Sequence, residues 1–248
     1  MIKRHLNVPL ILEINMNYKR ILIKLSGEVF SGTNGANIDM QMLMQISSAL
    51  KLLKEEGKEI AIVVGAGNFV RGRDIKDVVR SRADSMGMLA TIINSIALKD
   101  ALEKTGLDAE VYSAVLMSEI CKTYRRDDAV RDLKNGIITI LAAGTGNPYF
   151  STDMAAALRA IEINADVILF AKNVDGVYDK DPKKYGDAVK YDKVTYSTIL
   201  SRQLSVIDMA AAVLCDEFGM RSVLFALKEP MNIVEAGKGG NIGTIIEK

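Results

Sequence analysis

The sequence predicts an α/β fold, a three-layer α/β/α sandwich with a mostly parallel central sheet. Short runs rich in Ile, Val and Leu alternate with longer runs whose apolar residues have helical spacing. Several of the short runs, such as residues 59–64 and 137–142, are apolar at nearly every position. Strands of that kind are typical of parallel sheets that helices cover on both faces.

The elements can be placed in order along the chain. Asp39 is suited to cap the first long helix, and Gly57, Gly106 and Gly136 are placed to end helices. Residues 173–196 are polar and rich in turn formers, which predicts a small hairpin. The predicted strands are residues 21–25, 59–64, 110–112, 137–142, 167–171, 222–227 and 242–246. The predicted helices are residues 40–56, 85–104, 127–134, 152–164, 206–218 and 230–236.

The length of 248 residues suits one compact domain. We expect this domain to span residues 18–248, after an N-terminal extension at residues 1–17. Within it we expect two lobes, at about residues 18–165 and 166–248, because the α/β pattern resumes after the polar stretch.

The composition excludes several classes of function. The chain has 32 basic and 31 acidic residues and no apolar run of transmembrane length, so we expect no general binding to nucleic acids or membranes. Its one histidine, His5, leaves little scope for a histidine-dependent mechanism or a histidine metal site. We interpret Cys121 and Cys215 as reduced core thiols of a cytoplasmic protein.

Two incomplete phosphate-binding motifs overlap at residues 63–74, VVGAGNFVRGRD. A dinucleotide fingerprint begins at Gly65 but lacks its third glycine. A P-loop spacing begins at Gly67, but Arg73 stands where the lysine is required. If this segment binds phosphate, the lysine must come from another part of the chain.

Other segments at the ends of predicted strands supply what this one lacks. In an open parallel sheet, ligands bind beyond the carboxyl ends of the strands. Glycine lets backbone N–H groups approach an anion closely, and helix N-termini add partial positive charge. The segments that follow the strands are residues 24–28, 65–68, 143–148 and 172–176, and three of these four are rich in glycine. Together they predict a polyphosphate site in which Lys24 supplies the missing charge.

Six motifs taken together resemble those of the bacterial uridylate (UMP) kinases, a branch of the amino-acid-kinase family. They are KLSGE (24–28), VVGxGNFxRG (63–72), ADSMGMLAT (83–91), GTGNPYFSTD (144–153), VDGVYDKDP (174–182) and DMAAAVLC (208–215). The first two mark the wider family, whereas the third and fourth are more specific to the uridylate branch. The resemblance runs from about Tyr18 to Lys248.

The resemblance implies the amino-acid-kinase (carbamate-kinase-like) fold and a reversible phosphoryl transfer in pyrimidine nucleotide biosynthesis. The γ-phosphoryl group of ATP would pass to UMP, giving UDP and ADP, with Mg²⁺ carried by the ATP phosphates rather than by a protein metal site. UMP would bind in the first lobe and ATP in the second. The resemblance also implies a homohexamer, inhibition by UTP and activation by GTP.

It further implies roles for individual residues. The catalytic residues would be Lys24, Arg71, Asp153 and Asp208. The ATP site would comprise Lys24, Leu25, Ser26, Gly27, Gly67, Arg71, Lys172, Asn173, Tyr178 and Asp181. The UMP site would comprise Gly65, Ala66, Asp84, Thr145, Gly146, Asn147, Pro148, Tyr149, Phe150, Ser151 and Thr152. A GTP-effector region would comprise Gly32, Thr33, Asn34, Gly35, Ala36 and Asn37.

Some of these residues also suit a purely structural role. Asp153 would favour the dipole of the helix that it begins, and Asp208 could be an N-cap. Tyr178 and Asp181 lie in a turn that neighbouring glycine and proline residues would form in any case. Ala66 stands where the family usually has glycine, which is compatible with the loop if its φ stays negative, but its methyl group could narrow the UMP phosphate pocket.

The residue types fit phosphoryl transfer to a phosphate. A phosphate dianion is a competent nucleophile at pH 7, so the reaction needs charge neutralisation and positioning rather than a general base. Lys24, Arg71, Mg²⁺ and backbone N–H groups would offset the repulsion between the two anions. Mg²⁺ needs few protein ligands, so a cluster of carboxylates is not required.

Two alternative functions use the same fold. Other kinases of the family phosphorylate a carboxylate, but the segment 144–152, with Asn147 and several hydroxyl groups, favours a nucleotide acceptor. A non-enzymatic protein that stores nucleotides or oxyanions is the second alternative. The presence of Lys24, Arg71 and Asp153 argues against it.

Overall fold

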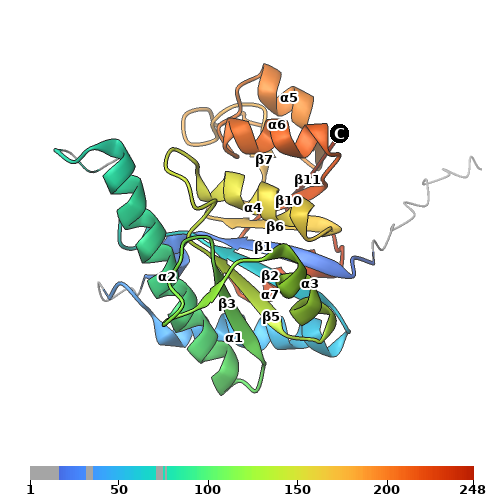
Figure 1. The fold of residues 1–248 in the computed structure, drawn as a ribbon. Helices are drawn as coiled ribbons and strands as arrows, with labels where there is room; N and C mark the ends of the chain where they lie inside the picture. The colour runs from blue at the N-terminus through green and yellow to red at the C-terminus, as the bar shows by residue number, and fades with distance from the viewer. Residues whose placement is uncertain (1–16, 32–35, 71–74, 76) are drawn as a thin grey trace, which may run out of the picture.

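The computed structural model describes residues 17–31, 36–70, 75 and 77–248 and confirms the predicted α/β/α sandwich. A nine-stranded sheet lies between two layers of helices (Figure 1). All neighbouring strands are parallel except β10 and β11, which pair antiparallel. In spatial order the strands are β4 (Lys122–Thr123), β3 (Ala109–Ser113), β5 (Ile138–Ala142), β2 (Glu59–Val64), β1 (Arg20–Leu25), β6 (Val167–Lys172), β10 (Ser222–Ala226), β11 (Thr244–Glu247) and β9 (Lys193–Thr195).

The helices divide between the two faces of the sheet. One face is covered by α1 (Met40–Glu55), α2 (Arg80–Lys104) and α7 (Met231–Gly237). The other is covered by α3 (Arg126–Lys134), α4 (Thr152–Glu162), α5 (Tyr196–Ser201) and α6 (Met209–Glu217). The first turns of α2 project beyond the rest of the molecule (Figure 1). None of the described helices combines the length and apolar character needed to cross a membrane.

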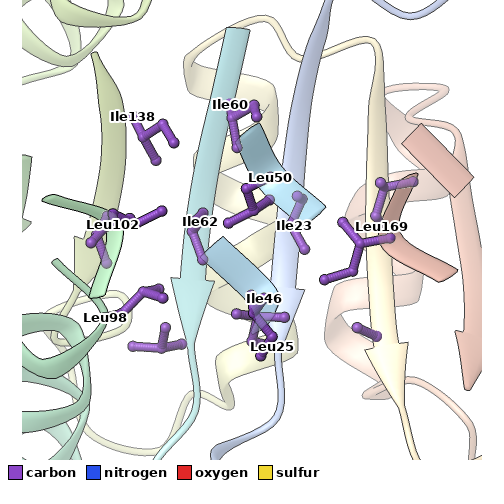
Figure 2. Packing of buried hydrophobic residues seen from close by; sticks show 14 of the residues in the cluster. Ile23, Leu25, Ile46, Leu50, Ile60, Ile62, Leu98, Leu102, Ile138 and Leu169 are labelled. Atoms are coloured by element: carbon purple, nitrogen blue, oxygen red, sulfur yellow. The ribbon is translucent and has the colours of Figure 1, made fainter. Parts of the chain in front are cut away.

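Side chains alternate across β1 and β6, and this alternation determines which residues face α4. In β1, Ile23 and Leu25 pack beside Ile46 and Leu50 of α1 (Figure 2). Lys24 lies between them in sequence and therefore projects to the opposite face, where α4 lies.

The same rule applies to β6. Leu169 packs on the α1 face, whereas Phe170 packs on the α4 face. Lys172, two residues after Phe170, projects to the α4 face as well. The alternation thus directs Lys24 and Lys172 towards the same helix.

The carboxyl ends of β1 and β6 form a topological switch point. β2 lies on one side of β1, and β6 lies on the other. Connections that leave neighbouring parallel strands in opposite directions open a crevice at the carboxyl ends, and ligands of α/β proteins bind in such crevices. The fold therefore places Lys24 and the loops after β1, β2, β5 and β6 at one edge of the sheet.

Most predicted elements are confirmed, but some boundaries are wrong. α2 begins at Arg80 rather than at residue 85, because an ion pair from Arg80 to Asp84, at 2.9 Å, supports a polar first turn that has no apolar periodicity. α4 ends at Glu162 rather than at 164 because Asn164 takes a positive φ of 52°. The hairpin of β7 (Val177–Tyr178) and β8 (Lys190–Tyr191) is confirmed. The sequence prediction did not include β4, β9, α5 and the 3₁₀ helix η1 (Gly27–Phe30), which are too short to show periodicity.

Candidate active site

The loops after β1 and β2 pack backbone against backbone. The Gly65 N–H donates to the carbonyl oxygen of Leu25 at 2.9 Å. A Cβ atom at Gly27 would lie 2.1 Å from the backbone nitrogen of Gly67, and one at Gly65 would lie 2.8 Å from the nitrogen of Gly27. Only glycine permits this approach at both positions. The two predicted phosphate-binding segments therefore form one continuous backbone surface.

Beside this surface, two lysines share one carboxylate. The Lys24 Nζ lies 3.0 Å from Oδ1 of Asp153, and the Lys172 Nζ lies 2.7 Å from Oδ2. The Lys172 Nζ also donates to the carbonyl oxygen of Val206 at 2.6 Å. The three side chains are nearly buried, with exposed fractions of 10%, 10% and 18% for Lys24, Asp153 and Lys172. Two ammonium groups and one carboxylate leave an excess of positive charge at the switch point.

Burial and charge shift the pKa values of this cluster. Burial by itself would raise the pKa of the Asp153 carboxyl, but the charges of Lys24 and Lys172 and their hydrogen bonds hold it well below its usual value. Burial lowers the pKa of Lys172, and Lys24 adds to this effect, while Asp153 opposes it. Asp153 is therefore ionised at neutral pH and keeps two like charges close together.

The local sequence explains how α4 presents Asp153. The hydroxyl of Ser151 caps the helix by accepting from the Met154 N–H at 3.1 Å. Asp153 follows in the first turn, where a negative charge also favours the helix dipole. Ser151, which was predicted to contact UMP, thus has a capping role in this structure. Both the structural and the functional interpretation of Asp153 fit its position.

Asp208 is an N-cap, as its alternative interpretation proposed. Its Oδ1 accepts from the N–H groups of Ala210 and Ala211, at 3.1 and 3.3 Å, at the start of α6. Its own N–H lies 3.4 Å from Oδ2 of Asp153. Asp208 therefore contacts the lysine–aspartate cluster through its backbone.

The segment 144–152 is held in place by α2. The Oδ2 of Asp84 accepts from the Tyr149 N–H at 2.9 Å, and Arg80 donates to the same carboxylate. Tyr149 has a positive φ of 73°, and its ring and that of Phe150 are largely exposed. The structure thus brings together two predicted parts of the UMP site, Asp84 and the segment 144–152. Within the segment, the hydroxyl of Thr145 accepts from the Asn147 N–H at 3.2 Å.

The residues predicted to bind ATP differ in burial and in the groups that their side chains contact. Lys172 was assigned to the ATP site, and its ammonium group donates to Asp153 at 2.7 Å. Leu25 is fully buried in the core, so that only its backbone can face a ligand. The Asn173 side-chain amide donates to the Glu28 carboxylate. Tyr178 donates to Asp175 at 3.0 Å, and Asp181 accepts from the Lys183 N–H at 2.9 Å, so both make contacts within their own turn region.

Some predicted residues lie outside the described part of the chain. They are Arg71 and, in the effector region, Gly32, Thr33, Asn34 and Gly35. Asn37 is described, and its carbonyl oxygen accepts from the Asn68 side chain at 2.7 Å. Ala66 does not have a positive φ, so the methyl group that replaces the usual hydrogen causes no backbone strain.

Sequence reasoning assigned no role to two polar residues of α2 that hold the loops. Thr91 and Asn94 lie on the buried face of α2, and the Thr91 hydroxyl accepts from the Ala143 N–H at 2.8 Å. Asn94 donates to the Gly65 carbonyl oxygen at 2.8 Å and pairs with Asn68. The available signal was a polar residue within the apolar run Ile92–Ile93–Asn94–Ser95–Ile96.

The described residues contain no group of three or more His, Cys, Asp or Glu side chains that could hold a metal ion. The carboxylate of Asp153 is already bound by two lysines, and one oxygen of Asp208 caps a helix. This donor set suits a hydrated cation that arrives with a phosphate ligand rather than a resident metal.

Two hollows on the described surface lie away from these loops. One is lined by Ala165, Phe218 and Arg221 and the other by Arg20, Glu59 and Asn164, which lie near the amino ends of the strands. Neither contains a predicted site residue. A backbone surface that binds phosphate groups is shallow and polar, so it need not form a deep hollow.

Comparison with known proteins shows which proteins share this sequence pattern and fold. Residues 19–226 match the amino acid kinase family. The UMP kinase from Bacillus anthracis is 35% identical, with a TM-score of 0.89 over 93% of this chain and 96% of that chain. The UMP kinase from Ureaplasma parvum is 34% identical, with a TM-score of 0.88 over 94% of this chain and 100% of that chain. The uridylate kinase from Archaeoglobus fulgidus is 27% identical, with a TM-score of 0.70 over 91% of this chain and 99% of that chain. The chain belongs to the amino acid kinase family.

Proposed function

We propose that this protein is a UMP kinase, which transfers the γ-phosphoryl group of ATP to the 5′-phosphate of UMP and forms UDP and ADP. The observation that carries the proposal is the Lys24–Asp153–Lys172 cluster at the switch point, beside two interlocked glycine loops. The similarity to UMP kinases over nearly the whole chain supports this acceptor.

The cluster provides what the reaction needs. The donor and the acceptor are both anionic phosphates, and the main barrier is their mutual repulsion. Lys24 and Lys172 place two positive charges at the crevice, and Asp153 holds both in fixed positions before the substrates arrive. Arg71 would add a further positive charge from the loop after β2. The acceptor phosphate is itself the nucleophile, so no group on the protein has to remove a proton.

We assign the substrates to the two lobes. UMP binds in the lobe of residues 18–165, against Gly65, Ala66 and the segment 144–152, which Asp84 holds by the Tyr149 N–H. ATP binds towards the lobe of residues 166–248, with its phosphates on Lys24–Gly27 and Gly67 and its adenosine near Tyr178 and Asp181. The phosphates then meet at the Lys24–Asp153–Lys172 cluster.

A Mg²⁺ ion carried by ATP would neutralise and orient the phosphate oxygens here. The protein would need to supply only hydrogen-bond acceptors for the waters of such an ion. Asp153 and Asp208, at the first turn of α4 and the N-cap of α6, are the carboxylates placed to accept from such waters.

We also propose that the protein is a homo-oligomer, a hexamer as the family resemblance implies. An exposed apolar stripe on α2 supports this proposal. Met86, Leu89, Ile93 and Ile96 follow a spacing of three and four residues and are each 45–49% exposed. A stripe of this kind is typical of a helix that packs against a second copy. We further propose that the enzyme acts in the cytoplasm and is inhibited by UTP and activated by GTP.

The test is an ADP-release assay with UMP, CMP, aspartate and glutamate compared side by side at saturating ATP and Mg²⁺. We expect UMP to be phosphorylated most efficiently. A preference for an amino acid would assign the chain to another branch of its family. ATP turnover that stays at background with every acceptor would contradict a kinase function. The same assay with added UTP or GTP tests the regulatory proposals.

A further inference from the structure

A buried amide on α2 holds the glycine loop after β2. Asn94 is fully buried, with 0% exposure. Its Nδ2 donates to the Gly65 carbonyl oxygen and to Oδ1 of Asn68, both at 2.8 Å. In return, Nδ2 of Asn68 donates to Oδ1 of Asn94 at 2.9 Å. The two side chains therefore form a reciprocal pair of hydrogen bonds.

The partners determine the orientation of both amides. Nδ2 of Asn94 faces the Gly65 carbonyl and Nδ2 of Asn68 faces the Asn37 carbonyl, and a carbonyl oxygen can only accept. Turning either amide around would place two acceptors against each other. The network thus has one arrangement, and it connects α2, the loop after β2 and the segment before α1.

The bond to Gly65 determines where the next backbone N–H points. In a planar trans peptide the carbonyl and the N–H point in opposite directions. Because the Gly65 carbonyl is directed towards α2, the N–H of Ala66 is directed away from it. Gly27 lies against this peptide, since a Cβ on Gly27 would be 2.9 Å from the Ala66 nitrogen. The hydrogen bond from Asn94 to Gly65 therefore sets the position of backbone N–H groups on the surface that the loops after β1 and β2 share.

We propose that Asn94 is a positioning residue for the reaction. It fixes the peptide between Gly65 and Ala66 and the side chain of Asn68, so that the loop presents its N–H groups to the acceptor phosphate in one orientation. This inference rests on the proposed UMP kinase function. It adds a residue on the interior of α2 that touches neither substrate and acts through Gly65 and Asn68.

The first test measures the loop without using activity. Hydrogen exchange read by mass spectrometry would compare the unmodified protein, Asn94→Ala and Ser95→Ala. Ser95 is a matched control because it is also fully buried on α2, but its hydroxyl donates only to Thr91 within the helix. We expect about tenfold faster exchange in residues 65–70 of Asn94→Ala, with residues 144–152 unchanged. Ser95→Ala should match the unmodified protein in both segments. Unchanged exchange at 65–70 in Asn94→Ala would overturn the inference.

The second test is kinetic and separates positioning from stability. We expect Asn94→Ala to raise the KM for UMP by about tenfold and the KM for ATP less, while Ser95→Ala changes neither. A folded Asn94→Ala protein with faster exchange but unchanged KM and kcat would also overturn the inference, because the network would then serve stability alone. If Asn94→Ala does not fold, both measurements are made on Asn68→Ala. This substitution removes the hydrogen bonds between Asn68 and Asn94 and leaves the bond from Asn94 to Gly65. We expect smaller increases in the exchange rate of residues 65–70 and in the KM for UMP than in Asn94→Ala.

The two proposals can fail separately. An unmodified protein that does not phosphorylate UMP would contradict the proposed function. Hydrogen exchange in residues 65–70, together with the affinity for UMP measured by calorimetry, would then be compared between the unmodified protein and Asn94→Ala. This comparison would still decide whether Asn94 positions the loop. Conversely, an active enzyme whose Asn94→Ala and Asn68→Ala variants behave like Ser95→Ala would leave the function standing and remove this role.

Discussion

Lys24 and Asp153 form a nearly buried ion pair, 3.0 Å long, between the end of β1 and the first turn of α4. Lys172, from the neighbouring strand β6, binds the other oxygen of the same carboxylate. The pair therefore joins the sheet to the helix layer at the switch point and leaves a surplus positive charge there. Its removal should affect both chemistry and stability, and these effects can be separated.

Removing the Lys24 charge should reduce the chemical step. We expect Lys24→Ala to lower kcat about 10²- to 10³-fold, because the transferring phosphoryl group loses a charge that is most valuable in the transition state. Folding should be largely retained, since Asp153 keeps its bond to Lys172. Single-turnover kinetics and thermal unfolding would measure the two effects. Lys19→Ala is the control, because that side chain is 77% exposed and lies at the other end of β1; an equal loss of kcat in both variants would contradict the assigned role.

The strand pattern made much of this site predictable from the sequence. Lys24 was placed after a strand that is buried on both faces, and the glycine loops were placed at the same sheet edge. The role of Lys172 was not predictable in the same way. Its partner Asp153 belongs to a different element, and their contact depends on how α4 crosses β1 and β6.

The interior of α2 shows the same limit. The apolar periodicity of α2 indicated a helix, but it does not report which loop a buried polar side chain will meet. Thr91 and Asn94 acquire their partners only because α2 packs beside the ends of β2 and β5. Likewise, the polar first turn of α2 carries no periodic signal and is supported by the side-chain pair Arg80–Asp84. Local pattern predicts the elements, whereas these contacts depend on tertiary packing.

Removing the Asp153 charge should destabilise the fold. We expect Asp153→Asn to lower the free energy of unfolding by about 3–5 kcal/mol, because two nearly buried ammonium groups lose their counter-charge. Chemical denaturation at pH 7 would measure the change. Asp100→Asn is the matched control, since the Asp100–Lys104 pair is exposed and its loss should cost less than about 1 kcal/mol. Equal effects of the two substitutions would contradict the importance assigned to the Asp153 cluster.

The contribution of Asp153 should also depend on pH. Its pKa in the folded protein lies well below the ordinary value of 3.8, so the unfolded chain binds the proton first as the pH falls. The carboxylate therefore stabilises the folded state fully above about pH 5, and this contribution is lost progressively as the pH falls towards the folded pKa. The difference in unfolding free energy between the unmodified protein and Asp153→Asn should be constant near neutral pH and shrink in acid. A difference that grows on acidification would show the opposite sign of linkage.

Gly27→Ala should disturb both glycine loops. The added Cβ would lie 2.1 Å from the Gly67 nitrogen, and backbone atoms cannot move aside as a flexible side chain can. We expect a loss of about 1–3 kcal/mol in stability together with higher KM values for both substrates. Gly186→Ala serves as the control, because no atom lies within 4 Å of its added Cβ. If Gly27→Ala matched this control in denaturation and in KM, the close contact between the loops would be wrong.

The exposed stripe of α2 should contribute to self-association. Ile93 lies in the middle of the stripe, and Ile93→Glu would place a charge where a second copy is expected to exclude water. We expect this variant to shift the mass measured by sedimentation or light scattering from the assembled form towards the smaller species. Met231→Glu is the matched control, because Met231 is 54% exposed on α7, away from the stripe. If both variants retained the mass of the unmodified protein, α2 would not be an essential contact of the assembly. If both dissociated, the interface would extend across α7 as well.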